Sequence, residues 1–163
     1  MRDHDVAEAS RAAATVKATE PVLMAVCCFV IILALVVGVG LATGLVLRHV
    51  VQTLPLWIGV VLGARRSRTT GWIGLPMFLF WLVLMSLIWL YLIGIARVIS
   101  GHFSPIEVAM TIIVGAASFV GIVVFARFKS YLSGVAALGV FIMVAVVQWV
   151  CFRVSFFPAI AHR

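Results

Sequence analysis

An uncharged apolar run of about 26 residues, 22–47, constrains the fold of this chain more than any other feature. About 20 apolar residues are enough for a helix to cross the hydrocarbon of a bilayer. Backbone groups in hydrocarbon must find their hydrogen bonds within the protein, which leaves helices and closed barrels as spanning structures. The apolar runs do not alternate with period two, as barrel strands do. We therefore expect an all-α integral membrane helical bundle.

The overall composition agrees with a membrane location. The 163 residues are 65% hydrophobic and 10% charged, with a mean hydropathy of +1.28, whereas about a quarter of the residues in soluble domains are charged. The net charge is +7, and most of the basic residues flank apolar runs. Anionic lipid headgroups are the counterions available at those positions. The placement of the charges thus favours the lipid bilayer over a nucleic acid as partner.

The chain divides into three parts. We expect a polar N-terminal tail over 1–20, a transmembrane helical domain over 21–153 and a short C-terminal tail over 154–163. The first apolar run is longer than one crossing needs, so a helix over 22–41 leaves residues 42–44 for a tight turn. The expected spans are 22–41, 45–64, 71–95, 105–126 and 131–152.

The stretch 45–68 decides whether the chain crosses the membrane four or five times. Arg48 and His49 lie near its start, and Pro55 interrupts it. The alternative to a span is a re-entrant or interfacial segment at 50–64, which gives four crossings. A helix lying in the interface needs a polar face, but the residues over 54–62 are apolar around nearly the whole helix. This pattern favours a short, kinked fifth span.

The distribution of Lys and Arg supports the same choice. Cytoplasmic loops carry an excess of these residues. Four spans place about six on each side of the membrane, whereas five spans place about eight on the N-terminal side and about four on the other. We therefore prefer five spans with the N-terminus inside. The preference for Arg over Lys and the Ala- and Val-rich spans indicate a bacterial cytoplasmic (inner) membrane.

A few polar residues near the span ends are the candidates for chemistry. In the five-span arrangement they lie near the outer face and form a candidate polar cluster of Arg48, His49, Arg97, His102 and Glu107. Glu107 is the only acid beyond the N-terminal tail, and Ser104, Pro105 and Glu107 have the pattern of a capping box. We favour this capping role for Glu107 over a role as a proton carrier. We likewise expect His49 and His102 to be hydrated histidines at the membrane interface and not ligands of a metal or haem.

A second set of basic residues lies at the other ends of the spans. These residues favour a role as topology determinants in contact with anionic lipid headgroups; they are Arg65, Arg66, Arg68, Arg127 and Lys129. Nucleic-acid recognition needs a folded surface of basic and aromatic residues, which these short loops do not offer.

The sequence contains no HExxH, P-loop or GxSxG motif and no pair of intramembrane carboxylates. We expect no enzymatic activity and no cofactor. Glycine-rich helix faces and minimal loops favour a packing or assembly subunit, which associates with other membrane proteins or with copies of itself. The alternative is a small oligomeric transporter or channel, motivated by Arg48, Gln52 and Glu107.

Overall fold

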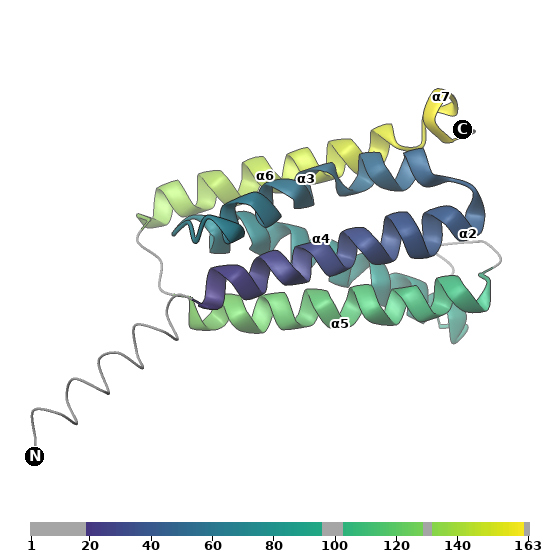
Figure 1. Cartoon of the computed structure of the whole chain (residues 1–163), viewed down its shortest axis with the longest axis horizontal. Coiled ribbons are helices and arrows are strands. Elements are labelled where there is room, and N and C mark those ends of the chain that lie inside the picture. The colour runs from purple at the N-terminus through teal and green to yellow at the C-terminus, as the bar shows by residue number, and fades with distance from the viewer. Residues whose placement is uncertain (1–18, 96–102, 129–131, 162–163) are drawn as a thin grey trace, which may run out of the picture.

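The structure is a computed structural model that describes residues 19–95, 103–128 and 132–161. These residues form a single bundle of helices (Figure 1) and contain no strand. Five of the helices are long and apolar enough to cross a membrane. The expectations of an all-α bundle and of five spanning helices are confirmed on that basis.

The spans differ from the expected ranges only at their ends. The first span is a helix over Thr19–Thr43, in which the π-helix η1 covers Ala34–Gly40 and α2 covers Leu41–Thr43. Gly44 ends it in the left-handed conformation, with φ 71°. The remaining spans are α3 (Val46–Ala64), α4 (Thr70–Leu92), α5 (Pro105–Arg127) and α6 (Gly134–Val154), and a short helix, α7 (Pro158–Ala161), lies in the C-terminal tail.

Helix α3 contains the stretch on which the span count depended. It is continuous from Val46 to Ala64, with Pro55 buried inside it. Proline has no N–H to donate to the carbonyl of Val51, and membrane helices tolerate this loss where neighbouring helices pack around the site. The segment 50–64 therefore lies within one continuous helix of spanning length, which favours the five-span arrangement over a separate re-entrant or interfacial segment.

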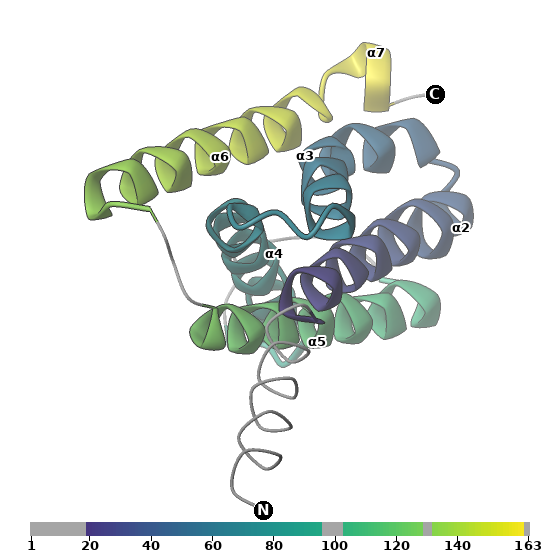
Figure 2. The ribbon, with the colours of Figure 1, turned by 60° about the vertical axis from the view of Figure 1, so that its left-hand side comes forward.

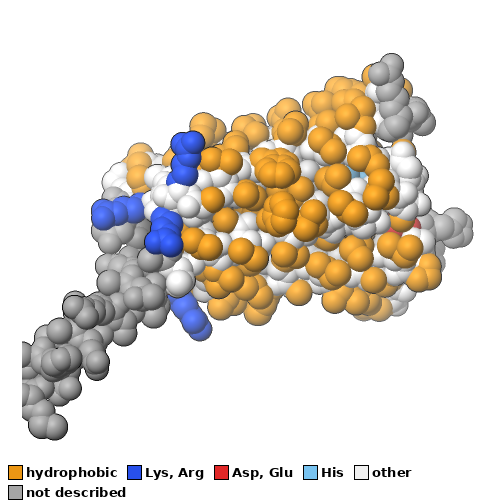
Figure 3. All heavy atoms as spheres, viewed as in Figure 1, with side chains coloured by type: hydrophobic (Ala, Val, Ile, Leu, Met, Phe, Trp, Pro, Cys, Tyr) orange, Lys and Arg blue, Asp and Glu red, His pale blue; other side chains and the backbone are white. Residues whose placement is uncertain are grey.

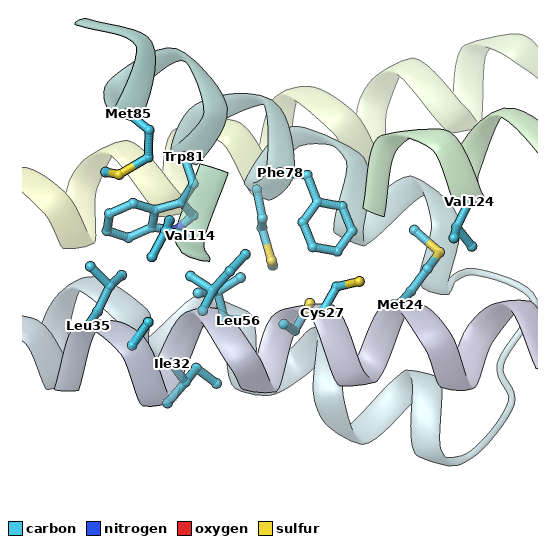
Figure 4. Close-up of a cluster of buried hydrophobic side chains, with 14 of the residues drawn as sticks. Met24, Cys27, Ile32, Leu35, Leu56, Phe78, Trp81, Met85, Val114 and Val124 are labelled. Carbon is cyan, nitrogen blue, oxygen red and sulfur yellow. The ribbon is translucent and has the colours of Figure 1, made fainter. Parts of the chain in front are cut away.

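Helix α4 lies between α3, α5 and α6 and contacts each of them. The π-helical part of the first span packs against α3 and α5, and α6 packs mainly against α3 and α4 at the edge of the bundle (Figure 2). The core between them is apolar; its almost fully buried side chains include Met24, Leu56, Phe78 and Trp81 (Figure 4). Most of the surface of α6 faces outward, because only 17% of its most apolar window is buried, against 44% for the first span.

Glycines bring these helices close together. A methyl group added at Gly59 would lie 2.8 Å from Sγ of Cys28, and one at Gly63 would meet the carbonyl of Pro21. On α5, a methyl group at Gly121 would lie 2.6 Å from the ring of Phe78. Gly59 and Gly63 of α3 and Gly121 of α5 thus serve contacts within the chain.

Candidate functional site

The two ends of the bundle carry different polar groups. The start of the first span, the end of α3, the start of α4 and the end of α5 meet at one end, which we call the basic end. Arginine side chains gather there, while the middle of the visible face is covered by hydrophobic side chains (Figure 3). The opposite end holds the start of α3, the start of α5 and the end of α6.

Arg48 lies at the opposite end, in the first turn of α3. Its guanidinium carbon is 4.0 Å from the ring centroid of Phe156, in the segment that follows α6. A cation over an aromatic face is stabilised by the ring quadrupole. The Nε atom of Arg48 is buried and has no hydrogen-bond partner. Arg48 therefore faces the C-terminal segment of the chain.

One helical turn further along α3, three side chains form a hydrogen-bonded group that we call the polar seam: Gln52, Gln148 and Ser155. Nε2 of Gln52 donates to Oγ of Ser155 over 2.9 Å, and Nε2 of Gln148 donates to the main-chain oxygen of Gln52 over 3.1 Å. All three residues are buried, and Oε1 of Gln148 has no partner. The polar seam joins α6 and the turn after it to α3.

His49 follows Arg48 in the sequence but faces a different part of the bundle. Its Nδ1 lies 2.9 Å from the carbonyl oxygen of Leu45, and the side chain is 8% exposed. A methyl group at Gly40, near the end of the first span, would lie 3.6 Å from this nitrogen. The histidine is thus enclosed between α3 and the first span, where a hydrated interface histidine was expected.

Glu107 completes the capping box of α5. Its carboxylate accepts from the N–H of Ser104 over 2.7 Å, and Oγ of Ser104 accepts from the N–H of Glu107 over 3.3 Å. The favoured capping role is confirmed. Within the described ranges, no hydrogen bond or ion pair links Arg48, His49 and Glu107. The other two members of the expected polar cluster, Arg97 and His102, lie outside the described residues.

The expected lipid-facing residues lie at the basic end and are exposed: Arg65, Arg66, Arg68 and Arg127. Lys129, the fifth, lies outside the described residues. Phe128 keeps the end of α5 close to the start of α4, because a methyl group at Gly71 would lie 2.7 Å from its ring. Trp72 and Phe125 stack edge to face at 5.1 Å, which adds to the same contact.

Few of the described residues in the interior between the two ends have groups that could bind a ligand or react. Oγ of Ser118 on α5 and Nε1 of Trp81 on α4 are buried there without a hydrogen-bond partner. In the described part of the chain, no three His, Cys, Asp or Glu side chains lie together as metal ligands do. The strongest candidate site is therefore the opposite end, where Arg48 and the polar seam lie next to one another.

Sequence reasoning included Arg48 in the polar cluster but left out Gln148 and Ser155. Gln148 is the only strongly polar side chain inside the apolar run of α6. A lone glutamine in such a run must find a partner, because an unsatisfied amide in hydrocarbon is costly. This rule predicts from the sequence that Gln148 has a hydrogen-bond partner within the bundle. Ser155 lies beyond the end of α6, and its contact with Gln52 depends on how the helices pack.

Comparisons of the chain with protein-family models, with curated proteins and with solved structures gave no match.

Proposed function

We propose that this multi-pass membrane protein is a non-enzymatic packing or assembly subunit of a larger membrane complex. The filled interior of the bundle carries the proposal: Leu56, Phe78 and Trp81 meet there and are almost fully buried. Transport of a polar solute normally needs buried polar residues near the middle of the membrane. Here the larger polar groups lie nearer the ends, and those of the polar seam hydrogen-bond to one another.

The exposed surface of α6 supports an assembly role. Large apolar side chains cover this helix on its outward side; they include Leu138, Ile142, Met143, Val146 and Trp149. Gly139 lies among them, and a methyl group added there would meet no other atom within 4 Å. Small residues on an exposed membrane helix allow a second helix to approach closely. Helix α6 is the least buried of the five spans and thus offers an apolar face to another membrane protein.

We also propose a location in the bacterial cytoplasmic membrane with the N-terminal tail inside. The charge distribution supports this orientation. In the described residues, the basic end carries four arginines, whereas Arg48 and Arg153 lie toward the other end. Positively charged segments are retained on the cytoplasmic side.

One observation favours a small oligomeric transporter as the second candidate. Oε1 of Gln148 and Nε of Arg48 are a buried acceptor and a buried donor without partners, and both lie at the opposite end. Intramembrane polar groups of this kind commonly mark substrate pathways. Several copies of the chain would be needed to surround such a pathway, because the interior of one copy is filled.

The test is extraction of the full chain in a mild detergent, followed by sizing and identification of co-purifying proteins. Reproducible, unlike partner chains are expected. Gly139→Leu on α6 should lose these partners, whereas Ala116→Leu, at an exposed small residue of α5, should retain them. A homo-oligomer without other chains that moves a solute into vesicles would contradict the subunit role and favour the transporter.

A further inference from the structure

The turn between α3 and α4 holds an arginine in a conformation that favours glycine. Arg66 has φ 53°, which costs an L-residue with a Cβ atom about 1 kcal/mol or more. The N–H of Ser67 donates to the carbonyl of Leu62, and the N–H of Arg66 donates to the carbonyl of Gly63, both over 2.9 Å. This is the Schellman pattern, in which the left-handed position is usually a glycine.

The end of α4 shows the same motif with the usual residue. Gly94 has φ 79°. The N–H of Ile95 donates to the carbonyl of Leu90, and the N–H of Gly94 donates to that of Tyr91. The two turns have equivalent hydrogen bonds, although one has an arginine and the other a glycine at the left-handed position. The turn between α3 and α4 therefore does not need an arginine to form, and its conformation does not account for an arginine at this position.

The residues around Arg66 indicate which kind of group its guanidinium binds. Arg65, Arg66 and Arg68 belong to this turn, and Arg127 ends α5 next to the start of α4. All four side chains are exposed (Figure 3 shows the basic end), and Glu20 is the one carboxylate of the described residues at this end. The apolar surface of the helices begins directly beside them, which places the arginines at the depth of lipid headgroups.

The arginines come from two adjoining segments, the turn and the end of α5, which the Gly71 and Phe128 contact holds together. Guanidinium groups bind phosphate oxygens through paired hydrogen bonds. Basic pockets between helices on the cytoplasmic side accept anionic lipid headgroups. We propose that the basic end binds an anionic lipid whose headgroup carries two phosphates, one near the α3–α4 turn and one near Arg127.

The site predicts a specific order of lipid affinities for the full chain in detergent. Diphosphatidylglycerol, with two phosphates, is expected to bind at least about tenfold more tightly than phosphatidylglycerol, and phosphatidylcholine most weakly. Binding is measured by native mass spectrometry with each lipid added in turn. Equal retention of the three lipids, or equal affinity for the two anionic ones, would overturn the proposal. So would binding of inorganic pyrophosphate as tight as that of diphosphatidylglycerol.

Two variants distinguish a lipid-binding role of these arginines from a role in membrane topology alone. Arg66→Gly should weaken diphosphatidylglycerol binding about fivefold and raise the thermal unfolding midpoint, because glycine suits the turn. Arg127→Gln should weaken binding by a similar factor. Arg153→Gln, near the opposite end, is the matched control and should leave it unchanged. If Arg66→Gly binds the lipid as tightly as the parent protein, or if Arg153→Gln weakens binding equally, the proposal is wrong.

Discussion

The side-chain amide of Gln148 on α6 donates a hydrogen bond of 3.1 Å to the main-chain oxygen of Gln52 on α3. Pro55, three residues after Gln52, interrupts the hydrogen bonding of α3 in this turn. Helix α6 is the least covered of the five spans, yet it is attached at this end by directional bonds. Because lipid tails are as apolar as the helix, such bonds contribute to its attachment alongside close packing.

The hydrogen bond between Gln52 and Ser155 should appear as a coupling energy. In a double-mutant cycle, Gln52→Ala and Ser155→Ala are expected to be coupled by about 0.6 kcal/mol, and by less than about 2 kcal/mol, as is usual for hydrogen bonds between membrane helices. The measurement is unfolding of the single and double variants in mixed micelles. Ser86, whose hydroxyl bonds to the carbonyl of Leu82 within α4, provides the control: Gln52→Ala and Ser86→Ala should be additive. A coupling of zero for the first pair would contradict the contact.

Because α3 lies close to the first span at Gly63, substitution of this glycine by alanine should lower stability much more than the same substitution at Gly139. A methyl group at Gly63 would meet the Pro21 carbonyl and lie 2.7 Å from Cβ of Ala25. Gly63→Ala should therefore lower the free energy of unfolding by about 1–3 kcal/mol, the usual cost of overpacking. Gly139→Ala is the matched control, because nothing lies within 4 Å of its added methyl group. The thermal midpoint in detergent should fall for the first variant only; an equal response of both would contradict the contact.

The capping box of α5 predicts how two of its residues respond to substitution. Ser104→Ala removes the acceptor for the N–H of Glu107 and should lower stability by about 1 kcal/mol. Glu107→Gln should cost less, because a glutamine side chain still accepts from the N–H of Ser104. Thermal unfolding of the two variants gives the order. If Glu107→Gln leaves stability unchanged but abolishes a solute flux measured in vesicles, the carboxylate has a transport role beyond its cap.

The spans were predictable from sequence because each requirement is local. Length and apolarity define a spanning helix, and the pattern over 104–107 marks the start of α5. The continuity of α3 through Pro55 also followed, since the residues around it offer no polar face. The charge count added the preference for five spans. None of these arguments needs to know which helix is next to which.

The site was harder to predict because it depends on which helices are neighbours. Arg48 and His49 are adjacent in the chain, but successive residues of a helix point in directions about 100° apart. One therefore meets Phe156, and the other is enclosed next to the first span. Likewise, Gln52 meets Ser155, which is 103 positions away. Sequence spacing on one helix gives a face, and only the packing of α6 identifies what that face contacts.

The proposed orientation makes a prediction that cysteine labelling can check from both sides of the membrane. Thr43→Cys lies at the end of the first span and Ser67→Cys in the turn between α3 and α4, at opposite ends of the bundle. With the basic end inside, a membrane-impermeant maleimide should label Thr43→Cys in intact cells, and Ser67→Cys only after the membrane is opened. The parent protein, in which Cys27 and Cys28 are buried and Cys151 is partly buried, gives the background. Labelling of Ser67→Cys in intact cells would reverse the orientation and place the arginine-rich turn outside.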